Sequence, residues 1–112
     1  MPEVHSELKF DNPFQLLCAV MLSAQCTDRR VNLVAPQLFR AYPTAKELAH
    51  ATSEDVKSII SSISYPNAKA KHLVEMAKGL MNNYNGEVPE SIEDLMSLSG
   101  VGRKTANVVA SI

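Results

Sequence analysis

Apolar residues recur along this chain at steps of three and four positions, which is the spacing of one face of an α-helix. The clearest example has an inner face of Ala70, Leu73, Ala77, Leu80, Met81 and Tyr84 and an outer face of Lys71, Glu75, Lys78 and Asn82. No convincing alternation of apolar and polar residues, as in a half-buried strand, occurs anywhere. The pattern predicts an all-α, orthogonal multi-helix fold of about seven short helices joined by tight turns.

Capping residues indicate where these helices begin. Asn12 and Pro13 start an almost wholly apolar segment that reaches Gln25, which predicts a buried central helix. Thr27 caps a second helix, which Pro36 should kink or divide. Further helices are predicted to start at Thr44, at Thr52 or Ser53, at Asn67 after the Ser64-Tyr65-Pro66 turn, and at Ser91, and the Asn85-Gly86 pair should end the long fifth helix.

Composition and charge narrow the function. The chain has 112 residues, of which 46% are hydrophobic and 21% charged, as in one globular domain. It has no long apolar run and no visible signal peptide, so we expect no membrane contact. A net charge of −1 gives no general attraction to nucleic acid, so any DNA binding must come from a local site. Cys18 and Cys26 fit no metal or redox spacing, which predicts buried, reduced thiols and no metal site.

The stretch LSGVGRKTANVV interrupts the helical pattern with Gly100-Val101-Gly102 and continues with Arg103-Lys104. A short helix, a Gly-x-Gly turn and a second helix would direct backbone N–H groups outward as a notch for one phosphate. Both glycines are expected to be required by the shape of the turn. A nucleotide-binding phosphate loop does not fit, because Lys104 lacks a preceding glycine and the loop lacks a preceding strand. A plain helix–helix turn with two surface cations remains the alternative.

Lys104 has a second candidate role. It falls in the first turn of the predicted last helix and directly follows Arg103. The positive end of the helix dipole and the charge of Arg103 both disfavour the ammonium form of Lys104. They favour a neutral amine, which can form a Schiff base. A solvated surface charge is the commoner role of an isolated lysine, so its context has to decide.

Three segments in order, Met21–Asn32, Asn85–Leu95 and Leu98–Val109, resemble the endonuclease III branch of the helix-hairpin-helix DNA glycosylases. The resemblance extends from Leu8 to the C-terminus. It implies a base excision repair enzyme that removes oxidised pyrimidines from double-stranded DNA and nicks abasic sites as a β-lyase. The lysine at the position of Lys104 would attack C1′ of the flipped nucleoside, displace the base and form the Schiff base.

The resemblance also implies the domain organisation. Residues 1–112 would be a single domain of the six-helix barrel type, truncated at its C-terminus, with the helix-hairpin-helix motif at 91–112. Lys104, and Ala24-Gln25 in place of a glutamine pair, point away from the adenine-excising branch.

Several residues acquire DNA-binding roles through the resemblance. Gln25 matches the residue that fills the gap left by the flipped nucleotide, and Tyr65 falls where the family places a wedge into the opposite strand. Such insertion partly replaces the stacking lost on flipping. The expected contacts to the DNA backbone are Gly100, Val101, Gly102, Arg103 and Thr105. The chain departs from the family at Ser99, where proline is usual, and at Ser64 and Pro66 in the wedge turn.

The family's catalytic aspartate and the four cysteines of its 4Fe–4S cluster follow the hairpin, beyond Ile112. Neither Cys18 nor Cys26 corresponds to a cluster ligand, and Asp11 and Asp28 are interpreted as helix-start residues. We therefore expect no cofactor in this chain, and expect the 112 residues alone to be inactive or only weakly active as a lyase.

Two non-enzymatic alternatives remain, a helix-hairpin-helix DNA-binding module without catalysis and an unrelated helical interaction domain. The last helix also ends on an apolar stripe of Val108, Val109 and Ile112, which predicts self-association. For a prokaryotic protein the resemblance implies a cytoplasmic location at the nucleoid.

Overall fold

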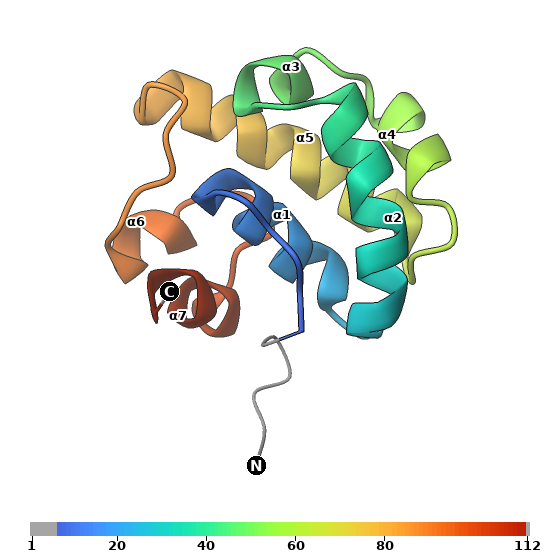
Figure 1. The fold of residues 1–112 in the computed structure, drawn as a ribbon. Coiled ribbons are helices and arrows are strands. Elements are labelled where there is room, and N and C mark those ends of the chain that lie inside the picture. The colour runs from blue at the N-terminus through green and yellow to red at the C-terminus, as the bar shows by residue number, and fades with distance from the viewer. Residues whose placement is uncertain (1–6, 112) are drawn as a thin grey trace.

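The computed structural model describes residues 7–111, which form seven helices and no strand (Figure 1). The helices are α1 (Pro13–Ser23), α2 (Asp28–Ala41), α3 (Ala45–Ala49), α4 (Ser53–Ile59), α5 (Pro66–Asn83), α6 (Ile92–Met96) and α7 (Arg103–Ser111). Helix α1 lies in the middle, and α2, α5 and α7 pack around it (Figure 1). The predicted all-α fold is confirmed.

The central helix is buried as its composition predicts. Asn12 caps it by accepting a hydrogen bond from the N–H of Gln15 at 2.9 Å, and Pro13 occupies its first position. Every residue from Leu16 to Ser23 is buried, and Leu17 and Leu22 have no exposed surface. An apolar helix of this kind is stabilised by neighbours on all sides, which fixes the position of its C-terminal end.

Four further predicted caps, at Thr27, Thr44, Thr52 and Ser91, are present. The hydroxyl groups of Thr27, Thr52 and Ser91 accept from the backbone N–H three residues on, at 3.0–3.1 Å. Thr44 instead pairs with Glu47, whose carboxylate accepts from the Thr44 N–H at 2.9 Å and from its hydroxyl. This second bond lowers the pKa of Glu47. Four of the helix starts are therefore fixed by local side-chain chemistry.

The structure corrects two predictions about proline. Pro36 does not divide its helix, since α2 continues through it to Ala41, and the alternative of a kink at Pro36 stays a prediction. Helix α5 begins at Pro66 and not after a cap at Asn67, and Tyr65 precedes it with φ 53°, in the left-handed region. Proline suits the first helical position because its missing N–H has no intrahelical acceptor there.

Helix α5 has the predicted inner face except at its end. Met81 is 36% exposed, whereas Val74 and Met76, which the repeat did not include, are buried. Asn85 and Gly86 end the helix with left-handed backbones, and the Gly86 N–H donates to the carbonyl of Leu80 at 2.9 Å. The predicted stop is confirmed.

The C-terminal apolar stripe is part of the core. Val109 is buried and Val108 is half-buried, and α7 packs against α1 and α6. Ile112 lies outside the described residues. The described part of the stripe therefore contributes to the core, and self-association through it stays a prediction. Within residues 7–111, no helix has the length and apolarity needed to cross a membrane.

Candidate functional site

The Gly-x-Gly turn joins α6 to α7, and its two glycines differ. Gly100 has φ 76°, and a Cβ atom there would lie 2.7 Å from the Cβ atom of His72 on α5. Gly102 has no positive φ, and a Cβ atom there would meet nothing within 4 Å. The expectation that both glycines are required by the shape of the turn was right for Gly100 and wrong for Gly102, which faces open space.

Val101 anchors this turn. Its side chain is buried, and its N–H donates to the carbonyl of Leu98 at 3.2 Å. Next to it, Ser99 donates its hydroxyl to the carboxylate of Glu75 at 2.9 Å, where the family usually has proline. The buried Val101 side chain and the Ser99–Glu75 bond hold the turn against the rest of the domain.

Outward-facing N–H groups come from the start of α7. The Ala106 N–H donates to the carbonyl of Gly102 at 2.9 Å, so the helix begins there. The N–H groups of Arg103, Lys104 and Thr105 precede the first intrahelical bond and lie at the positive end of the helix dipole. The predicted phosphate notch thus depends on the first turn of α7, where Arg103 and Lys104 are exposed, and not on the N–H of Val101.

Lys104 lines a cavity of about 290 Å³ between α7, the end of α1 and the start of α2. The other lining residues are Val20, Ser23, Ala24, Gln25, Cys26, Asp28 and Thr105. The fold therefore brings Lys104 and the predicted gap-filling residue Gln25 to the lining of one cavity. A lysine that lines a cavity next to a helix N-terminus is a candidate amine nucleophile.

Sequence reasoning missed Asp28 as part of this cavity. It is the first residue of α2, as predicted, but it is half-buried and lines the cavity with Lys104. Its position three residues after Gln25 in the same turn was the available signal.

The predicted gap-filling residue Gln25 and the predicted wedge residue Tyr65 have the same unusual backbone. Gln25 has φ 55° and Tyr65 has φ 53°, and both side chains are exposed. Non-glycine residues in this region are strained by about 1–3 kcal/mol, and such residues cluster at functional sites. Tyr65 is not among the residues that line the Lys104 cavity, although its turn contacts that of Gln25.

The cysteines do not form a cofactor site. Cys18 is buried, and burial raises the pKa of its thiol, whereas Cys26 is only half-buried, in contrast to the prediction. Both thiols are free. Residues 7–111 contain no group of three or more histidine, cysteine or acidic side chains that could hold a metal ion. These residues do not fit the four-cysteine cluster that the resemblance implies.

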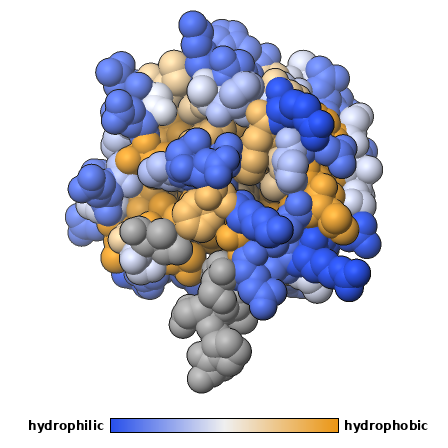
Figure 2. Space-filling view, in the orientation of Figure 1, coloured by the Kyte–Doolittle hydropathy of each residue, from blue (hydrophilic) through white to orange (hydrophobic). Residues whose placement is uncertain are grey.

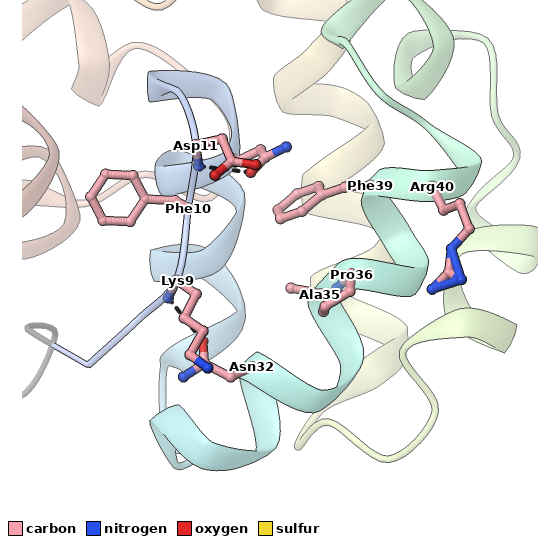
Figure 3. A pocket seen from close by; sticks show the side chains of 9 residues that line it. Lys9, Phe10, Asp11, Asn32, Ala35, Pro36, Phe39 and Arg40 are labelled. Atoms are coloured by element: carbon pink, nitrogen blue, oxygen red, sulfur yellow. Dashed lines mark hydrogen bonds between the residues drawn. The ribbon is translucent and has the colours of Figure 1, made fainter.

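A second, larger cavity of about 490 Å³ lies between the segment before α1 and helix α2. Apolar side chains gather toward the middle of the face in Figure 2, and Phe10 and Phe39 line the cavity in Figure 3. Two of its polar side chains hold the segment before α1, because Asn32 accepts from the Lys9 N–H and Gln15 accepts from the Asp11 N–H, each at 2.9 Å (Figure 3). Lys104 and its phosphate notch favour the smaller cavity as the functional site.

The model of the HhH-GPD superfamily base excision DNA repair proteins matches residues 18–110.

Curated relatives are proteins named endonuclease III. That of Synechocystis sp. is 44% identical over 108 residues, which are 96% of this chain and 49% of the relative. That of Bacillus subtilis is 43% identical over 111 residues, 99% of this chain and 51% of the relative. The chain thus spans about half the length of the curated relatives it matches.

Two solved structures share the fold. A trapped endonuclease III–DNA covalent intermediate gives a TM-score of 0.93 at 47% identity, over 99% of this chain and 52% of that chain. A non-covalent endonuclease III–DNA complex gives a TM-score of 0.92 at 47% identity, over 98% of this chain and 51% of that chain. Nearly all of this chain therefore has the fold of the corresponding half of those proteins.

Proposed function

Because this chain belongs to the HhH-GPD superfamily of base excision DNA repair proteins, we propose that it is the helical part of an endonuclease III-type DNA glycosylase and abasic-site lyase. Residues 1–112 would form this domain, with the helix-hairpin-helix motif at 91–112. The observation that carries the proposal is the position of Lys104, which shares one cavity with Gln25 at the start of the hairpin's second helix.

Lys104 would act as the nucleophile. Its neutral amine attacks C1′ of a nucleotide with a damaged pyrimidine, and the base leaves with the electrons of the glycosidic bond. Opening of the deoxyribose ring gives a protonated imine at C1′, which makes the proton on C2′ more acidic. Loss of that proton expels the 3′ phosphate and nicks the strand. At a preformed abasic site the amine condenses with the aldehyde, releases water and enters the same elimination.

The hairpin would hold the duplex by its backbone. The first turn of α7 offers N–H groups and two exposed cations to a phosphate, and Gly102 leaves its approach open. Gln25 would fill the gap of the flipped nucleotide, and Tyr65 would enter the opposite strand. Their exposure at adjacent turns supports this pair of roles.

The site of action would be bacterial DNA at the nucleoid, in the cytoplasm. The bacterial origin of the endonuclease III relatives supports this location. No step of the proposed reaction is assigned to an iron–sulfur cluster, because the described residues offer no ligand set for one.

Borohydride trapping on a duplex with one abasic site tests the reaction, because reduction of the imine leaves a permanent protein–DNA link. We expect trapping with the parent chain and with Lys71→Ala, an exposed lysine on α5, and none with Lys104→Ala. Trapping that survives in Lys104→Ala would exclude Lys104 as the nucleophile.

A DNA-binding module without catalysis is the second candidate, favoured by the phosphate notch alone. It predicts saturable binding of abasic duplex without any trapping by the parent chain. The trapping experiment therefore separates the two functions.

A further inference from the structure

We propose that Lys69 is a positioning residue, whose buried side chain fixes the turn of Gln25 and the turn of Tyr65 relative to each other so that both enter the duplex as one unit. The inference rests on the proposed function, since it concerns how the two side chains that would enter DNA are presented.

Lys69 lies near the start of α5 and is only 9% exposed. Its ammonium donates to the carbonyl of Leu22 at 2.8 Å, to the carbonyl of Ala24, and to the hydroxyl of Ser64 at 3.1 Å. An ammonium group has three N–H donors and no acceptor, so this set engages all three. The side chain therefore joins the end of α1 to the turn before α5.

The end of α1 shows why a cation is suited to this position. The last carbonyl groups of a helix lack intrahelical donors and form the negative end of its dipole. Here the Ser23 hydroxyl donates to the carbonyl of Val20 at 2.7 Å, and the Cys26 N–H donates to that of Ser23 at 3.0 Å. Lys69 supplies the donor for Leu22 from another helix, at a terminus that has no glycine cap.

Ser64 extends the contact to both strained residues. Its hydroxyl accepts from Lys69 and donates to the carbonyl of Gln25 at 2.8 Å. The backbone N–H of Lys69 also donates to the carbonyl of Tyr65 at 3.1 Å. The Lys69 N–H bond is the first backbone bond of α5 and does not depend on the side chain. The Lys69 side chain is thus connected to Gln25 through Ser64, and to the turn of Tyr65 through the same Ser64, which directly precedes Tyr65.

A lysine is a costly residue at this position. Burial lowers the pKa of Lys69, because it disfavours the charged form. Methionine has a similar length and would fill the space without a charge, but it could not satisfy the three acceptors. Left-handed residues persist only where their surroundings hold them, and Lys69 provides that support for both turns.

The test compares Lys69→Met and Ser64→Ala with Lys71→Met, an exposed lysine on the same helix. Amide hydrogen exchange of the free chain is measured at residues 24–26 and 62–65. Binding is measured on an intact duplex and on a duplex with a tetrahydrofuran abasic analogue flanked by 2-aminopurine. The exchange arm needs no DNA and reports on the turns alone.

We expect exchange at both turns to accelerate together by about tenfold in Lys69→Met, and less in Ser64→Ala. We expect the preference for abasic over intact duplex to fall by about fivefold, and the change in 2-aminopurine fluorescence on binding to become smaller. Affinity for intact duplex should change by less than about twofold, because the hairpin is unaltered. Lys71→Met should match the parent chain. A purely structural role would lower the unfolding temperature and leave the preference unchanged.

Unchanged exchange or an unchanged duplex preference in a folded Lys69→Met variant would overturn the inference. If that variant does not fold, Ser64→Ala decides by the same two measurements. A parent chain that binds both duplexes equally would overturn the proposed function and the role of Lys69 with it. If the parent chain prefers abasic duplex and the variants show the same preference, the role of Lys69 alone would be overturned.

Discussion

Gly100 lies directly against His72, so that a Cβ atom on the glycine would sit 2.7 Å from the Cβ atom of the histidine. Real Cβ atoms do not approach a neighbour so closely, and the φ of 76° at Gly100 is also unfavourable for other residues. Two residues on, Gly102 has neither constraint. One glycine is required by the fold, and the other leaves room for a ligand.

The two glycines should therefore separate stability from DNA binding. Gly100→Ala should destabilise the chain by about 1–3 kcal/mol, because it adds strain and a clash. Gly102→Asn should leave the free energy of unfolding within about 0.5 kcal/mol, because asparagine is a good cap, yet weaken binding of abasic duplex by blocking the N–H groups of α7. Urea unfolding and fluorescence anisotropy measure the two effects. Undiminished binding by Gly102→Asn would show that phosphate does not approach this face.

The central helix should dominate stability. Leu17 has no exposed surface, so Leu17→Ala should reduce the free energy of unfolding by about 2–5 kcal/mol through lost burial and a cavity. Leu33→Ala on α2 is the matched control, since Leu33 is 61% exposed and its loss should change stability by less than about 0.5 kcal/mol. Urea unfolding of both variants measures the contrast. Similar losses would mean that α1 is not the core helix.

The capping box of α3 should add a small acid sensitivity. The Thr44 hydroxyl lowers the pKa of Glu47 below its ordinary value of 4.5, so the folded chain holds this proton less tightly than the unfolded chain. The resulting stabilisation is present above pH 4.5 and is lost as pH falls through the lowered pKa. Glu47→Gln keeps a cap but cannot titrate, so its unfolding temperature should depend less on pH below that point. Parallel pH profiles of variant and parent would contradict this linkage.

The fold was predictable where local chemistry decides it. Asn12, Thr27 and Ser91 cap helices because their side chains satisfy nearby N–H groups, and this requires no knowledge of the rest of the chain. Met81 shows the limit of the repeat. It has the right spacing, but its sulfur lies beside the Gly86 turn and the residue is 36% exposed there.

The site was predictable as residues but not as a cavity. The Gly-x-Gly turn indicated Lys104 and the resemblance indicated Gln25, yet their meeting depends on the packing of α7 against α1. Tyr65 shows the same dependence, since a residue before proline generally favours an extended backbone. Contacts from Lys69 and Ser64, which no local pattern indicates, instead hold that turn in a left-handed form.

The two thiols give a further test of the cavity. Cys18 is enclosed by the core and its pKa is raised by burial, so it should not react with a thiol reagent in the folded chain. Cys26 is half-buried and lines the cavity with Lys104, so it should react. We expect one reactive thiol per native chain and two in denaturant. Saturating abasic duplex should slow the reaction of Cys26 by about tenfold, because the cavity is then covered. Cys26→Ser should abolish the native reaction, and equal rates with and without DNA would place the bound duplex away from Lys104.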